Sequence, residues 1–148
     1  MTSHAHTNKT ASRGIGLHIA TSFLLAGAKT VFVTARKAEG VNQAVADLNA
    51  LPGIKGKAVG IAGNASQTDE IEALVKQVKD VEPRLDILIA NAGATWGGPF
   101  ETSPDWASQK VVDLNVRGVF NLVRLYVHHT LRCYTNREIR PYSSKRRL

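Results

Sequence analysis

The feature that most constrains the fold is a regular alternation of short apolar segments with longer segments of helical periodicity. We expect helices at 13–27, 41–48, 66–78 and 104–125, and strands at 30–35, 57–62 and 85–90. Helices and strands that alternate at these lengths predict an α/β fold, in which helices cover both faces of a parallel sheet. The run at 85–90 is almost wholly apolar, so we expect this strand to be buried on both faces.

Local signals predict how three of these helices begin and pack. Ile15, Ile19 and Phe23 fall on one stripe of the first helix, with Ala20 and Leu24 beside it. Ser66 and Ser103 are candidate N-caps for the two later helices, because a hydroxyl oxygen accepts hydrogen bonds from the first backbone N–H groups.

The two ends of the chain depart from the pattern. Residues 1–9 are polar, and we expect them to form a disordered leader without a strand. Residues 10–123 are expected to form one domain. Residues 124–148 hold seven basic side chains and one acidic side chain, and we expect the end of a helix followed by a basic tail. Nucleic-acid binding would therefore rest on the tail alone, and we consider it an unfavoured alternative.

Composition excludes several classes of protein. A single cysteine, Cys133, excludes a disulfide framework within the chain. No run of 18 apolar residues is present, so we expect no membrane span, and the first residues lack the apolar core of a secretory signal. The adjacent histidines His128 and His129 would point apart on a helix, so we predict no metal site. These observations favour a cytoplasmic protein.

Residues suited to binding a nucleotide follow the expected strands. Gly14 and Gly16 open the first helix, where backbone N–H groups can approach a pyrophosphate. Arg36 ends the strand at 30–35, at a place where an acid would favour NAD and an arginine would favour NADP. Asn64 follows the next strand, and a turn of small residues at 91–93 follows the third. Parallel strands bind ligands at their carboxyl ends, where all these segments fall.

Residues 10–123 resemble a classical short-chain dehydrogenase/reductase. The matching segments are S-R-G-I-G at 12–16, A-G-A at 26–28, A-R at 35–36, N-A-S at 64–66, L-D-I-L-I-A-N-A-G at 85–93 and D-L-N-V-R-G-V-F at 113–120. They occur in the order and spacing of the family, and the joint match is specific although each piece is not. Residues 90–97 also resemble the branch that contains the rhamnolipid-type 3-oxoacyl-carrier-protein reductases.

The resemblance implies a Rossmann fold, NADP(H) as cofactor, and hydride transfer to a small-molecule carbonyl or from an alcohol. It assigns the diphosphate and the 2′-phosphate to Ser12, Arg13, Gly14, Ile15 and Gly16, the 2′-phosphate also to Arg36, the adenine to Asn64 and Ala65, and the ribose to Asn91, Ala92 and Gly93. Asn115 matches the asparagine of the catalytic Asn-Ser-Tyr-Lys tetrad, which helps to carry a proton relay. Gly118, inside the expected helix, predicts a close packing contact.

Two departures from the family follow from the same comparison. Lys9 and Thr10 stand where the family has Thr-Gly, and residues 4–8 stand where it has an apolar strand, so we expect a partial Rossmann domain without its first strand and its C-terminal strands. A gap in the middle of the sheet would leave the isolated chain helical but loosely packed. No tyrosine has a lysine four residues later, so the catalytic Tyr and Lys are absent.

The sequence thus predicts an NADP(H)-dependent oxidoreductase that is truncated and catalytically impaired. Two alternatives stay open. One is an inactive relative that binds a partner or a second copy through the helix at 104–125, a surface that commonly carries oligomer contacts in this family. The other is a nucleic-acid binder with a basic tail, whose binding would depend on salt and be lost when 124–148 is deleted.

Overall fold

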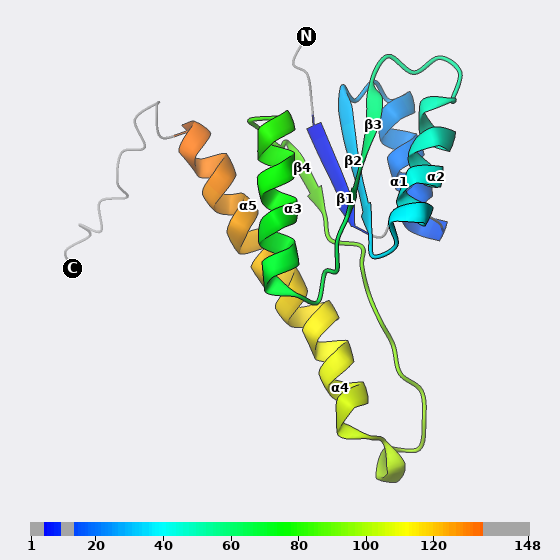
Figure 1. Cartoon of the computed structure of the whole chain (residues 1–148), viewed down its shortest axis with the longest axis vertical. Helices are drawn as coiled ribbons and strands as arrows, with labels where there is room; N and C mark the ends of the chain where they lie inside the picture. The colour runs from blue at the N-terminus through cyan, green and yellow to red at the C-terminus, as the bar shows by residue number, and fades with distance from the viewer. Residues whose placement is uncertain (1–4, 10–13, 135–148) are drawn as a thin grey trace, which may run out of the picture.

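The computed structural model describes residues 5–9 and 14–134 as a parallel sheet with helices on both faces. Helices α1 and α2 lie on one face and helices α3 and α5 lie on the other (Figure 1). The elements are β1 (Ala5–Lys9), α1 (Gly14–Leu25), β2 (Thr30–Ala35), α2 (Ala38–Asn49), β3 (Lys57–Ala62), α3 (Thr68–Val81), β4 (Ile87–Ile89), the 3-10 helix η1 (Phe100–Thr102), α4 (Asp105–Val112), the π-helix η2 (Asp113–Gly118) and α5 (Val119–Tyr134). The predicted α/β class and its parallel sheet are confirmed.

The four strands follow the order β3-β2-β1-β4, and every pair is parallel. This order matches the first four strands of the doubly wound order 3-2-1-4-5-6. The observed bounds of β2 and β3 coincide with the expected strands at 30–35 and 57–62. Helices α4 and α5 join through η2 into one rod, which extends beyond the sheet (Figure 1).

The expectation that the first strand is missing is wrong. Residues Ala5–Lys9 form β1 in the middle of the sheet, where Thr7 lies opposite Phe32 of β2 and Leu88 of β4. The physical reason is that strand propensity depends strongly on context, and the backbone groups of β2 and β4 need a partner between them. The predicted gap is therefore filled, and no missing central strand remains as a reason to expect a loosely packed chain. Residues 1–4 of the expected leader lie outside the described residues.

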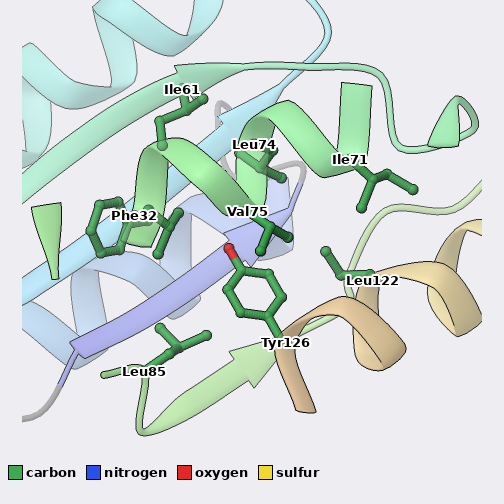
Figure 2. Close-up of a cluster of buried hydrophobic side chains, with 9 residues drawn as sticks. Phe32, Ile61, Ile71, Leu74, Val75, Leu85, Leu122 and Tyr126 are labelled. Carbon is green, nitrogen blue, oxygen red and sulfur yellow. The ribbon is translucent and has the colours of Figure 1, made fainter. Parts of the chain in front are cut away.

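Two apolar clusters, one on each face of the sheet, form the core. Strand β2 contributes to both, because successive side chains of a strand point to opposite faces: Val31 and Val33 join one cluster and Phe32 joins the other. The first cluster contains Ala20, Leu24, Ala28, Val31, Val33, Ala44, Leu48 and Ala58. The second contains Phe32, Ile61, Ile71, Leu74, Val75, Val78, Leu85, Leu122 and Tyr126. In Figure 2 the Tyr126 ring reaches from α5 toward α3 and the sheet.

Helix α1 packs mainly on the residues beside the expected stripe. Its buried residues are Gly16, Ala20 and Leu24, whereas Ile15 is 72% exposed and Ile19 only partly buried. The small residues Gly16 and Ala20 let the helix axis approach the sheet closely, which turns the bulkier Ile15 outward.

The N-caps of two helices each lie one residue later than expected. Gln67 and Pro104 are the N-caps of α3 and α4, and neither accepts a side-chain capping bond. Ser66 bonds to Asn64 instead of capping the helix. This bond turns the Ser66 hydroxyl toward the turn before the helix.

Strand β4 is less buried than its apolar sequence predicts. Ile87 is 37% exposed, and Leu88 and Ile89 are only partly buried. The reason is that β4 is an edge of the described sheet, with β1 on one side and no strand of the described residues on the other. Within that part of the chain, no helix is long and apolar enough to cross a membrane.

The rod formed by α4, η2 and α5 carries an exposed apolar surface. It consists of Val112, Val116, Phe120, Val123 and Val127, all more than 40% exposed, and we call it the α5 stripe. The residues recur at helical spacing, so they form a continuous line along one side of the rod.

Candidate functional site

The carboxyl ends of the four parallel strands lie at one edge of the sheet, and the predicted site residues follow them. Arg36 follows β2, Asn64 and Ala65 follow β3, and residues 91–93 follow β4. Residues 10–13, which connect β1 to α1, lie outside the described residues, and with them the site residues Ser12 and Arg13. The remaining predicted positions are brought to one edge of the sheet.

The amino terminus of α1 is built from glycine at this edge. Gly14 has a φ of 59°, a left-handed conformation that glycine adopts without strain, and a Cβ added there would meet nothing within 4 Å. Gly16 is buried, whereas Ile15 is exposed. The first turn contains no acidic side chain, so nothing in it offsets the positive end of the helix dipole. This arrangement suits a phosphate group.

Arg36 is an exposed cation at the carboxyl end of β2. Lys37 follows it and is exposed as well. Among residues 5–9 and 14–134, no acidic side chain forms an ion pair with Arg36. A guanidinium group in this position is available to hold a phosphate by paired charge-assisted hydrogen bonds.

The turn after β3 is shaped by the side chain of Asn64. Its Oδ1 accepts hydrogen bonds from the Ser66 backbone N–H at 3.1 Å and from the Ser66 hydroxyl at 2.9 Å. The Asn64 backbone N–H in turn donates to Oε2 of Glu70 at 2.6 Å. The amide oxygen is thus committed to the turn, and an adenine beside it would meet the Nδ2 group or the backbone. Ala65, the second residue predicted for the adenine, is buried.

Asn115 holds the loop after β4. Its Nδ2 donates to the Ala94 carbonyl oxygen at 2.8 Å, and its Oδ1 accepts from the Ala94 N–H at 2.8 Å. A Cβ added at Gly93 would lie 3.5 Å from the same Oδ1, which is ordinary contact. The Asn115 amide therefore bonds to both backbone polar groups of Ala94, as a neighbouring strand would. These bonds hold in place the loop next to residues 91–93. Its part in a proton relay stays a prediction.

Three residues of the helical rod contact the turn after β3 or the start of α3, and only one of these contacts was predicted from the sequence. Gly118 approaches the Ala65 carbonyl, which confirms the close packing expected from a glycine inside a helix. Asn121 Nδ2 donates to the Thr68 hydroxyl at 3.1 Å, and Arg117 donates to the Ser66 carbonyl at 3.4 Å. Asn121 and Arg117 gave no sequence signal, because their partners lie more than 50 residues away.

Comparison with known proteins decides the family. The model of the short chain dehydrogenase family matches residues 9–135. The chain belongs to this family. The resemblance drawn from the motifs is thereby confirmed.

Within the described residues, no group of three or more metal-ligating side chains gathers, here or elsewhere.

Several short-chain reductases are similar in sequence to the chain. A rhamnolipids biosynthesis 3-oxoacyl-[acyl-carrier-protein] reductase of Pseudomonas aeruginosa is 37% identical over 113 residues, which are 76% of this chain and 42% of that protein. A 3-oxoacyl-[acyl-carrier-protein] reductase of Synechocystis sp. is 35% identical over 112 residues, which are 74% of this chain and 43% of that protein. The chain thus spans less than half the length of these two reductases.

Solved short-chain dehydrogenases share the fold. The RhlG/NADP active-site complex of Pseudomonas aeruginosa superposes with a TM-score of 0.78 at 33% identity, over 86% of this chain and 48% of that one. A metagenomic short-chain oxidoreductase in complex with NADP gives a TM-score of 0.80 at 29% identity, over 88% of this chain and 57% of that one. The predicted Rossmann architecture is confirmed by both.

Proposed function

We propose that the chain forms the nucleotide-binding part of an NADP(H)-dependent oxidoreductase that acts on a small-molecule carbonyl or alcohol. The observation that carries the proposal is Arg36, an exposed cation free of acidic partners in the described residues, at the strand edge beside the glycine-rich start of α1. A 2′-phosphate distinguishes NADP from NAD, and an arginine at this point of a Rossmann fold accommodates it. Two structurally similar proteins are complexes with NADP.

Each part of the cofactor has a matching segment at the sheet edge. The diphosphate would lie at residues 14–16, with Ser12 and Arg13 beside it, because the backbone N–H groups at a helix start and the helix dipole favour an anion there. The 2′-phosphate would lie on Arg36, the adenine over Asn64 and Ala65, and the ribose along residues 91–93. Bound NADPH supplies the hydride. The protein residues named here bind and orient it.

The test of this assignment is the preference between NADP⁺ and NAD⁺, measured by isothermal titration calorimetry. The charge-assisted bonds of Arg36 to a phosphate are each worth about 1.5–3 kcal/mol, so we expect NADP⁺ to bind about 10–100 times more tightly than NAD⁺. Arg36→Asp should abolish this preference. Lys55→Asp makes the same change of charge in the exposed loop before the amino end of β3 and should leave the preference intact. A preference unchanged in Arg36→Asp would contradict the assignment.

We further propose that the 148 residues do not turn over substrate by themselves. In this chemistry a tyrosine is the acid/base and a lysine four residues later lowers the pKa of that tyrosine, and no such pair occurs in the sequence. Positioned proton transfer contributes roughly 10²–10⁴-fold to a rate. We expect no NADPH-dependent reduction of 3-oxoacyl thioesters by the purified chain. Steady turnover that disappears in Asn115→Ala would overturn this proposal and assign a catalytic role to Asn115.

The α5 stripe supports a second function, binding to another protein through the helix at 104–125. An exposed line of five apolar side chains is typical of a surface that pairs with a second copy or a full-length relative. Sedimentation of the wild-type chain should show a dimer, and Phe120→Asp should dissociate it. Ser108→Asp, a change at an exposed polar position of the same rod, is the control. A monomer at all concentrations would contradict this function.

Nucleic-acid binding and cellular location stay predictions. Residues 135–148, which hold most of the basic tail, lie outside the described residues. We do not favour nucleic-acid binding, because only the charge of the tail supports it. The cytoplasmic location expected from the sequence can be tested by cell fractionation.

A further inference from the structure

One short helical segment contacts both loops that would carry the cofactor. Residues 115–121, which we call the spacer segment, span most of η2 and the first residues of α5. Asn115 bonds to Ala94 in the loop after β4, and Asn121 bonds to Thr68 at the start of α3. Between them, Gly118 packs against the Ala65 carbonyl in the turn after β3. The spacer segment therefore determines how the two loops are separated.

Gly118 is the tightest of these contacts. A Cβ at this position would overlap the Ala65 carbonyl oxygen and would lie 3.0 Å from the Asp113 carbonyl oxygen. Both obstacles are backbone atoms, which cannot move aside as the end of a flexible side chain can. Either the turn after β3 or the rod itself would have to shift to admit one methyl group. Glycine is otherwise unfavourable inside a helix, so its presence here is explained by the contact rather than by helix formation.

We propose that Gly118 is a positioning residue of the nucleotide site, because it sets the distance between the rod and the turn that would hold the adenine. The inference rests on the proposed function. Ala65 lies directly between Asn64 and Ser66, whose mutual hydrogen bonds shape that turn. A displaced Ala65 carbonyl therefore displaces Asn64. If the turn moves rather than the rod, the loop after β4 keeps its bonds to Asn115, and the effect is confined to the adenine side.

The experiment measures binding of 2′,5′-ADP, the adenine half of NADP with its phosphate, to the full chain. We expect Gly118→Ala to weaken this binding about tenfold or more, since misplacing the polar contacts of one ligand group costs about 1.4 kcal/mol or more. Gly97→Ala is the matched control, because a Cβ at Gly97 meets nothing within 4 Å. It should bind as the wild-type chain does.

A local readout separates positioning from a general loss of stability. Amide hydrogen exchange in Gly118→Ala should accelerate at residues 64–66 and stay unchanged at residues 31–33 in the core of β2. Equal acceleration in both places, or wild-type affinity for 2′,5′-ADP, would overturn the inference. A wild-type chain that binds no nucleotide refutes the proposed function, and the exchange measurement still decides whether Gly118 positions the turn.

A second variant keeps the inference testable if Gly118→Ala does not fold. Asn121→Ala removes the hydrogen bond to the Thr68 hydroxyl without adding an atom. We expect it to weaken 2′,5′-ADP binding about three- to tenfold, in keeping with the loss of one hydrogen bond. Thr68→Ser retains the hydroxyl and should keep wild-type affinity. Unchanged affinity in Asn121→Ala would contradict the role of the spacer segment.

Discussion

Strand β1 is the element whose removal should have the largest effect on the sheet, and Thr7→Pro tests this. Thr7 is the middle residue of β1 and lies opposite Phe32 and Leu88 in the two neighbouring strands. Every N–H of a central strand faces one neighbour or the other, and proline has no N–H to donate. Proline also fixes φ near −65°, away from the value of about −120° typical of a parallel strand.

The expected loss of stability follows from these two effects. A lost backbone hydrogen bond costs about 1 kcal/mol, and the acceptor left buried without a partner costs about 1–3 kcal/mol more. We therefore expect the free energy of unfolding to fall by about 3 kcal/mol, before any cost of the altered φ. Urea denaturation followed by circular dichroism at neutral pH measures this difference.

Thr7→Val is the matched control for this substitution. It keeps the N–H and has high strand propensity, so the free energy of unfolding should change by less than about 1 kcal/mol. If Thr7→Pro unfolds at the same urea concentration as the wild-type chain, residues 5–9 do not form the central strand. The sheet would then have the gap that the polar sequence of this segment suggests.

Two further substitutions test the core and a hydrogen bond from a buried hydroxyl to a carboxylate. Leu24→Ala should lower the free energy of unfolding by about 2–5 kcal/mol, because Leu24 is 0% exposed, whereas Leu25→Ala at its 59% exposed neighbour should change it by less than about 0.5 kcal/mol. Equal effects would contradict the observed packing face of α1. Thr30→Val should cost about 1.5–3 kcal/mol, because the buried Thr30 hydroxyl donates to Oε1 of Glu82 at 2.8 Å. Chemical denaturation measures each change, and a Thr30→Val variant more stable than the wild-type chain would refute the second.

Local periodicity was sufficient to predict most of the helices and strands but not how they pack against one another. The periodicity at 41–48 predicted helix α2 correctly. Its apolar residues Val41, Ala44 and Leu48 form the buried face, because a 12-residue amphipathic helix has only one apolar side. Strand β1 could not be predicted, since Ala5–Lys9 is polar and becomes a strand only between two neighbours from residues 30–35 and 87–89. The exposure of Ile87 likewise depends on which strands stand beside β4, and a sequence pattern does not contain that information.

The candidate site likewise contains residues that short motifs identify and contacts that only the fold reveals. The glycines of α1, Arg36 and residues 91–93 follow their own strands, so short motifs were enough to identify them. The contact of Asn121 with Thr68 joins residues 53 positions apart and requires the fold. The bonds of the Asn64 amide oxygen to Ser66 are local, but the motif alone did not show them.

The most direct test of the account is a titration of the ¹⁵N-labelled chain with NADP⁺, followed residue by residue in ¹H–¹⁵N correlation spectra. We predict that the amides which shift are those of residues 14–16, 36–37, 64–65 and 91–93, at the carboxyl edge of the sheet. NAD⁺ at the same concentration should shift residues 36–37 far less, because it lacks the 2′-phosphate. Shifts confined to the basic residues of 124–148, or a folded spectrum that does not change, would contradict a nucleotide site at this edge.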